Sequence, residues 1–342
     1  MDKFFKRTLV GAAVAAAAVA GSANAAVQVV GDAVQFYGQA AGALIYSSNQ
    51  DSTNTVIADI ESRIGFRGVV EFEDLEPNFI WQMEGGNANN GTNSGGLGVR
   101  DTYLGFDWEG FGSIKYGRQL VAAYNIVDGH TNPGTGNVFD DWHGSAGGDL
   151  DADWQGRADH VIRYDSANFG GFTFSGTLSG MEADTSALVA SATAAYQNDR
   201  FLAHAGFYNQ GEHGEGATLE YDRSYFVLGG YLFLGDFTLN AAYRDATIDT
   251  ANSGENGQES YSMAVQYTID DHWFVKAGYA HKTTTTVADA AGQDDSDTAV
   301  TGRVAYLLPS SILYFDVRDY DFDGDDNSED GTNFVFGAEY YF

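Results

Sequence analysis

The last eleven residues of the chain, "TNFVFGAEYYF", alternate apolar and polar side chains. Apolar side chains occupy every even position from Phe334 to Phe342, whereas Asn333 and Glu339 stand at odd positions. Successive side chains of a β-strand point to opposite faces, so a period of two predicts a strand with one apolar face. Residues 260–269 and 312–320 repeat the pattern.

Sixteen segments of this kind follow one another, and the helical spacing of apolar residues is almost absent after residue 26. The predicted strands are residues 34–46, 60–72, 78–85, 99–108, 113–121, 157–166, 171–180, 188–197, 200–210, 219–233, 236–247, 258–269, 272–282, 298–307, 311–320 and 332–342. Tight turns are predicted at 73–77, 109–112, 167–170, 198–199, 270–271 and 308–310. Long polar connections are predicted at 47–59, 86–98, 122–156, 248–257, 283–297 and 321–331.

An even number of strands, with short turns on one side and long loops on the other, is typical of an outer-membrane β-barrel. Unpaired backbone groups are costly in hydrocarbon, so the first strand must pair with the last. A secreted β-sandwich would also alternate, but it must bury each second face against another sheet. Because the second faces here carry Ser, Thr, Gln, Asp and Arg, we predict an all-β fold, a transmembrane antiparallel β-barrel of sixteen strands. Its lumen would be too wide for side chains alone to fill.

The N-terminal residues have the features of a bacterial signal peptide. Lys3, Lys6 and Arg7 precede a short apolar run, and Ala23 to Ala25 offer small residues for cleavage before Ala26. The run is shorter than the ~20 residues that a membrane-spanning helix needs. We therefore expect residues 1–25 to be a signal peptide and residues 26–342 to form the barrel.

Charge and composition exclude several classes of protein. The chain has 48 acidic and 17 basic residues and a formal charge of −31, so a nucleic-acid partner is not expected. It has no cysteine, which excludes disulfides and thiolate metal sites. The nucleophile, phosphate-binding and dinucleotide-binding motifs of common enzymes are absent from the sequence. We therefore predict that the protein is not an enzyme and needs no cofactor.

An acidic segment near the C-terminus, "DYDFDGDDNSED", has the spacing with which a calcium-binding EF-hand loop begins. Its candidate ligands are Asp319, Asp321, Asp323 and Asp325. Position twelve is Asp330 where an EF-hand has a glutamate, and strands rather than helices flank the segment. A true EF-hand is therefore not predicted, and weak binding of a divalent cation stays an alternative to a merely solvated loop.

Five stretches resemble, in the right order and over the whole exported chain, the general porins of Gram-negative outer membranes. They are "VQFYGQAAGALIY", "SRIGFRG", "VRDTYLGFDWEGFGSIKYGRQ", "GRADHVIRYDSANFGGFTFSGTLS" and "FVFGAEYYF". The resemblance implies a homotrimer of sixteen-stranded barrels that passes small hydrophilic solutes by diffusion. It also implies that the third long loop, here 122–156, folds inward and that its acids face basic residues on the wall.

Carried over by motif, the basic residues of this constriction would be Arg63, Arg67, Arg100 and Arg157. Arg63 and Arg67 alternate with apolar neighbours and should point to water. Arg100 is less clear, because it lies in phase with the apolar Leu104. Gln39 stands where many relatives carry a base, so the basic ladder would be thinner here.

The acidic side of the constriction would come from "VFDDWHGSAGGDLDADWQGR", residues 138–157. The candidates are Asp140, Asp141, Asp149, Asp151 and Asp153, with Trp142 and Trp154 as anchors of the loop to the wall. Opposite charges across a narrow throat orient polar solutes and discriminate between ions. The alternative is that acids in this Gly-rich loop are only solvated.

The sequence thus predicts a diffusion channel in the outer membrane of a Gram-negative bacterium, in contact with membrane lipid and lipopolysaccharide. After removal of the signal, 47 acidic residues remain against 14 basic ones, so we expect a preference for cations. Two alternatives stay open: a solute-specific channel, and an adhesin or structural barrel whose external loops bind ligands.

Overall fold

The computed structural model describes residues 26–49, 54–86, 96–131, 138–140, 154–180, 187–213, 220–251, 254–322, 324 and 330–342. The predicted signal segment lies outside them. The strands are β1 (Val27–Val30), β2 (Val34–Asn49), β3 (Asn54–Ile60), β4 (Arg63–Phe72), β5 (Leu75–Gly85), β6 (Leu97–Trp108), β7 (Gly112–Leu120), β8 (Arg157–Ser166), β9 (Phe172–Ser179), β10 (Val189–Gln197), β11 (Phe201–Gln210), β12 (Glu220–Leu234), β13 (Phe237–Thr250), β14 (Gly254–Thr268), β15 (Trp273–Lys282), β16 (Asp297–Leu308), β17 (Ser311–Asp321) and β18 (Gly331–Tyr341). The two helices are α2 (Tyr124–Gly129) and α3 (Thr286–Ala291).

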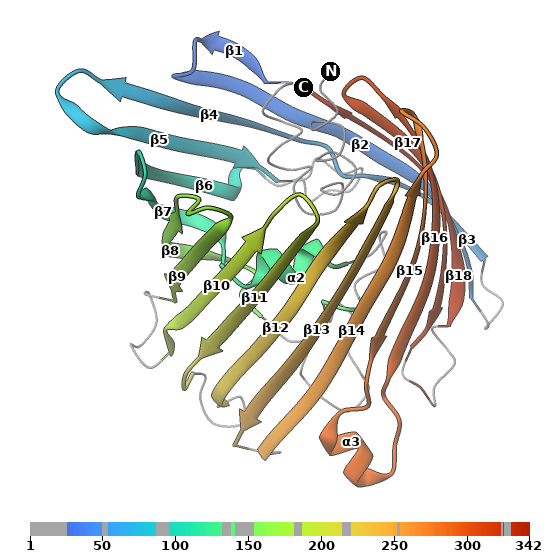
Figure 1. Cartoon of the computed structure of the whole chain (residues 1–342). Helices are drawn as coiled ribbons and strands as arrows, with labels where there is room; N and C mark the ends of the chain where they lie inside the picture. The colour runs from blue at the N-terminus through green and yellow to red at the C-terminus, as the bar shows by residue number, and fades with distance from the viewer. Residues whose placement is uncertain are drawn as a thin grey trace.

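The strands form one antiparallel sheet that closes on itself (Figure 1). The last strand, β18, pairs with β2 along its length, from Gly331 opposite Asn49 to Tyr341 opposite Gln39. Strands β3 and β4 are two parts of one wall strand, since both pair with β2, and β1 is a short hairpin partner of β2. The barrel therefore has sixteen wall strands, and the predicted fold class is confirmed.

Several boundaries differ from the prediction. The long connection expected at 47–59 is shorter, because β2 runs to Asn49 and β3 begins at Asn54. The connection expected at 248–257 is also shorter, because β13 runs to Thr250 and β14 begins at Gly254. At this second place polar side chains on both faces hid strands that continue past the apolar belt. The connection 283–297 holds α3, whose first turn is capped by the Thr285 side chain and which ends at Gly292 with a positive φ of 73°.

The two faces of the wall differ as the alternation predicts. On β13, Phe237 and Leu239 are exposed on the outer face, whereas Asn240 and Arg244 are buried on the inner face. An outer belt of apolar side chains suits contact with lipid, and a polar inner face suits a water-filled lumen. Neither described helix is long and apolar enough to span a membrane.

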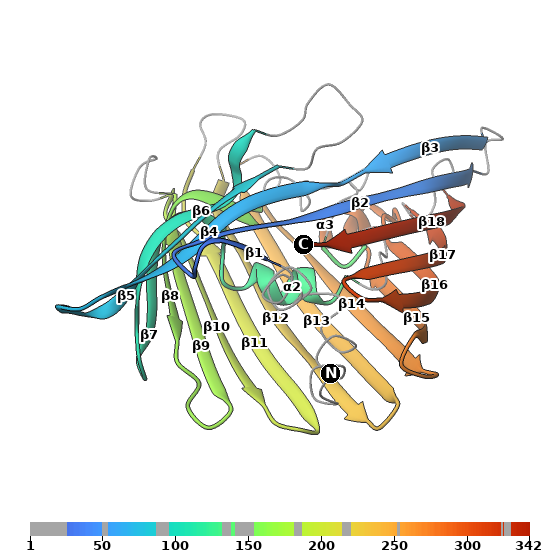
Figure 2. The same cartoon turned by 90° about the horizontal axis from the view of Figure 1, so that it is seen from above.

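The buried apolar cluster lies inside the barrel, where α2 packs on the wall (Figure 2). Val121, Ile126 and Val127 of the connection after β7 pack there, together with Phe139. Wall residues from β8 to β17, with Phe322 just after β17, complete the cluster. The described part of the longest connection thus lies on the inner side of the wall.

Candidate functional site

Helix α2 is fixed to the inner wall by hydrogen bonds at both ends. The backbone N–H groups of Ala122 and Ala123 donate to the hydroxyls of Thr177 on β9 (3.1 Å) and Ser191 on β10 (2.9 Å). At the other end, the Tyr231 hydroxyl on β12 donates to the carbonyl oxygen of Gly129. The Ser262 hydroxyl on β14 donates to the next carbonyl, that of residue 130. We call β9–β14 the anchoring wall.

Two imidazoles complete this attachment. The Nε2 atoms of His130, which is fully buried, and His204 on β11 lie 2.8 Å apart. One ring therefore donates a hydrogen bond to the other. The His130 ring also stacks on Tyr231, with 4.9 Å between ring centroids. A Cβ atom at Gly229 would lie 2.5 Å from His130 Nε2 and 2.7 Å from His204 Nε2. The wall therefore needs glycine there for the rings to meet.

The returning end of the connection is held by aromatic contacts. The Trp154 ring packs edge-on against Tyr208 and Tyr225, at centroid distances of 5.3 and 5.1 Å. The guanidinium groups of Arg223 and Arg244 lie 5.3 and 5.0 Å from its centre. These contacts agree with the anchoring role expected for Trp154, whereas Trp142 lies outside the described residues.

Across the lumen, the candidate arginines are held by wall side chains. Arg63 Nε donates to the Gln39 side-chain oxygen at 2.9 Å, and the Gln39 amide nitrogen donates to Glu339 at 2.8 Å. Arg67 donates to Gln35 at 3.2 Å, and its guanidinium lies 4.9 Å from the centre of the Tyr37 ring. Gln39, which stands where many relatives carry a base, thus connects Arg63 to Glu339 by two hydrogen bonds.

Arg100 lies on the inner face despite its phase with Leu104. Its Nε donates to Glu84 at 2.6 Å, and Glu84 also accepts from the inward Tyr37 hydroxyl at 2.8 Å. The pairing of β5 with β6 shifts register between Met83 and Gly85, which breaks the alternation ahead of Leu104. Arg157 Nε reaches Asp101 at 2.7 Å.

An acid that the sequence reading missed faces these arginines. Asp128, on the last turn of α2, has an exposed side chain and lies in the field of Arg157, Arg100 and Arg63. Although the side chain reaches water, the protein atoms that surround it inside the barrel desolvate its carboxyl and raise the pKa, while the three arginines act in the opposite direction. It is the only acid between residues 110 and 139, a signal that the dense acidic run further on concealed.

The predicted acids are only partly covered. Asp140 is half-buried beside the fully buried Phe139, and its charge acts on Tyr124 of α2. Asp141, Asp149, Asp151 and Asp153 lie outside the described residues, as do Asp323 and Asp325 of the candidate cation loop. Of that loop, Asp319 accepts a hydrogen bond from Thr332 at 2.6 Å. Within the described ranges no group of three acidic or His side chains could hold a metal ion.

The sequence of this chain matches the model of one protein family over nearly its whole length. The family model described as Gram-negative porin matches residues 12–342. The chain is a Gram-negative porin. A chitoporin of Vibrio furnissii is 31% identical, and the match covers 100% of both chains.

Two solved porins share the fold. The anion-selective porin from Comamonas acidovorans superposes with a TM-score of 0.75 at 20% identity, over 91% of this chain and 99% of its own. The trimer form of OmpT from Vibrio cholerae superposes with a TM-score of 0.66 at 19% identity, over 90% and 99%. As a member of the Gram-negative porin family with this fold, the chain is an outer-membrane diffusion channel.

The bases of the porin gather on the wall that faces α2. We call β15–β18, β2 and β4–β8 the charged wall. Ten of the 14 Lys and Arg residues after the signal segment lie on its inner face: Arg63, Arg67, Arg100, Lys115, Arg157, Arg163, Lys276, Lys282, Arg303 and Arg318. Seven acids of this wall pair with them or lie in their field: Glu61, Glu84, Asp101, Asp165, Asp297, Asp316 and Glu339. These bases thus outnumber the wall acids that pair with them.

The His130 contact predicts a pH dependence of the channel. Burial, with the charges of His204 and Lys276, lowers the pKa of His130 from 6.5 to about 3. A histidine that binds protons less readily when folded stabilises the attached loop fully above pH 6.5, and this contribution is lost as the pH falls toward about 3. We expect single-channel current noise to rise in this window.

The variant His130→Gln should flatten this pH response, because an amide hydrogen-bonds without titrating. His272→Gln, in the turn before β15, is the matched control. The same pH response in wild type and His130→Gln would contradict the assignment.

Proposed function

We propose that this porin passes ions and small hydrophilic solutes through a throat between α2 and the charged wall. The observation that carries the proposal is Asp128, which lies in the field of Arg63, Arg100 and Arg157 while α2 is bonded to the opposite wall. Charges of opposite sign across a throat with low-dielectric walls produce a transverse field. Such a field orients dipolar solutes and separates the paths of cations and anions.

The acids of the connection would set the ion preference. On the charged wall, ten inner-face bases stand against the seven wall acids that pair with them or lie in their field. If Asp128 and the five predicted acids Asp140, Asp141, Asp149, Asp151 and Asp153 face the same water, acids outnumber bases in the throat. We therefore propose a cation-leaning channel whose preference comes from the loop rather than from the wall. Salt would weaken it, since the Debye length is ~8 Å at physiological ionic strength.

The double variant Asp128→Asn with Asp140→Asn tests this. A unit charge about 8 Å away in water is worth roughly 0.5 kcal/mol for each ion, with opposite sign for K⁺ and Cl⁻. Screening over one Debye length of ~8 Å reduces this about threefold, so each substitution should lower the K⁺/Cl⁻ permeability ratio about twofold. Reversal potentials in planar bilayers under a KCl gradient measure the ratio. Asp236→Asn, in the tight turn between β12 and β13, removes an equal charge away from α2 and should change little. An unchanged ratio in the double variant would sink the proposal.

The similarity to a chitoporin over the full length favours a second candidate, a channel selective for chitin-derived sugars. In the same bilayers, block of the ion current by chitin oligosaccharides but not by maltose sugars would support it. Equal passage of both would leave the general channel.

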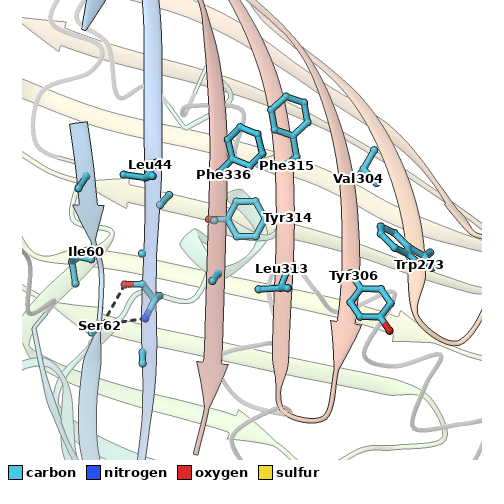
Figure 3. A pocket seen from close by; sticks show the side chains of 17 residues that line it. Leu44, Ile60, Ser62, Trp273, Val304, Tyr306, Leu313, Tyr314, Phe315 and Phe336 are labelled. Carbon is cyan, nitrogen blue, oxygen red and sulfur yellow. Dashed lines mark hydrogen bonds between the residues drawn. The ribbon is translucent and has the colours of Figure 1, made fainter. Parts of the chain in front are cut away.

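The outer surface carries a hollow suited to another copy of the chain (Figure 3). It measures about 870 Å³ and spans β2, β3 and β15–β18. Its floor holds the small residues Ala40, Gly42, Ala58 and Ala338, and bulky side chains such as Leu44 and Phe336 rim it.

Small residues allow close approach of membrane segments. We propose that a homotrimer forms through this face, as supported by the trimer form of OmpT, and that lipid and lipopolysaccharide cover the rest of the belt. The segment 1–25 would be removed on export.

Ala338→Trp should weaken the trimer, because the indole would fill the hollow. Ala241→Trp, also on the outer face but on β13, is the matched control and should remain trimeric. Mass photometry of both in detergent, with strand content checked by circular dichroism, gives the answer. A folded Ala338→Trp protein that stays fully trimeric would place the contact elsewhere.

A further inference from the structure

A second group of cations lies on the inner face of β15, β16 and β17, away from the arginines near α2. Arg303 donates to both oxygens of Asp316, at 2.6 and 2.8 Å, and Arg318 donates to Asp316 Oδ2 at 2.8 Å. The charges of Arg303 and Asp316 also act on the third cation, Lys276. One carboxylate is therefore shared by two arginines, and Lys276 stands opposite Arg303 on the neighbouring strand.

The Asp316 carboxylate and Lys276 are buried, whereas the two arginines are partly open to the lumen. Asp316 is 0% exposed, whereas the side chains of Arg303 and Arg318 keep 15% and 18% of their surface open. A guanidinium has five N–H donors, and Asp316 takes two from each arginine. Solutes in the lumen thus meet positive charge with donors to spare.

The nearest further acid is engaged elsewhere. Glu339 on β18 lies in the field of Arg303, but it accepts hydrogen bonds from Gln39 and Tyr341. Gln39 in turn accepts from Arg63, so Glu339 belongs to the link with that arginine. The group on β15–β17 keeps its excess of positive charge.

The cations are also held in place before any solute arrives. The Arg303 guanidinium lies 4.1 Å from the centre of the Tyr314 ring, and a Cβ at Gly337 would lie 1.9 Å from that ring. The missing side chain at Gly337 therefore gives Tyr314 its place under the arginine. Planar, preoriented guanidinium groups are suited to bind carboxylate or phosphate oxygens.

We propose that Lys276, Arg303 and Arg318 form an anion-binding site on the inner wall, which takes a carboxylate or phosphate group of a solute in transit. Its side chains are not among the three arginines that act on Asp128. An anionic solute could thus bind transiently to the wall of a channel whose loops are acidic.

Block of single-channel KCl current tests the site, with inorganic phosphate and succinate added separately at pH 7 and low salt. Wild type should show saturable block by at least one of them. Arg318→Gln should raise the concentration for half block about fivefold or more. Arg118→Gln, an equal substitution at an arginine paired one to one with Asp159, should leave it unchanged.

Two further variants keep the test decisive if Arg318→Gln does not fold. Lys276→Met removes a cation without touching the Asp316 pairs and should also weaken block. Asp316→Asn exposes the cations to lumen anions and should strengthen block. Phosphate block alone would assign the site to phosphate groups, and block by succinate would extend it to carboxylates. No block in wild type, or equal block in wild type, Arg318→Gln and Lys276→Met, would overturn the proposal. Reversal potentials of the Asp128 variant report separately on the throat.

Discussion

The pairing of β18 with β2 is the constraint on which the rest of this structure depends. An unpaired N–H or C=O costs several kcal/mol in hydrocarbon, so a membrane sheet cannot keep an edge. Eleven residue pairs, from Gly331 with Asn49 to Tyr341 with Gln39, remove that edge. Once the ring is closed, every strand has one face toward lipid and one toward water. Most bases of the chain then lie on the inner face, and ten of them line the charged wall.

The lumen is too wide for wall side chains alone to narrow it. The anchoring wall holds the segment that enters the lumen, and the charged wall carries the arginines that face it. The anchoring wall holds α2 through hydroxyls that bond to backbone groups and through the His130–His204 pair. It holds the returning end of the connection through the packing of Trp154. The charged wall holds its arginines through carboxylates and amides, with Arg63, Arg100 and Arg157 opposite Asp128. Because the attachment of α2 does not use the ladder arginines, those charges stay available to solutes.

Much of the fold could be predicted because lipid-facing and lumen-facing side chains alternate along each strand of a membrane barrel. The sixteen strands, the tight turns and the inward arginines Arg63, Arg67 and Arg157 followed from alternation and motif order. Arg100 could not be placed, because a register shift beside Gly85 changes the phase between strands. The helices α2 and α3 were missed, since six residues are too few for a helical period to show. Asp128 was missed because its role comes from where α2 docks, which depends on Gly229, His204 and Tyr231 on distant strands.

The central claim is that Asp128 faces the water of the throat. The chain has no cysteine, so Asp128→Cys provides a single thiol. A thiol reagent carrying a positive charge, added during single-channel recording, should lower the current in discrete steps and shift ion preference toward Cl⁻. If mass spectrometry shows the thiol fully modified while current and ion preference stay unchanged, Asp128 does not line the path of the ions and the account is wrong.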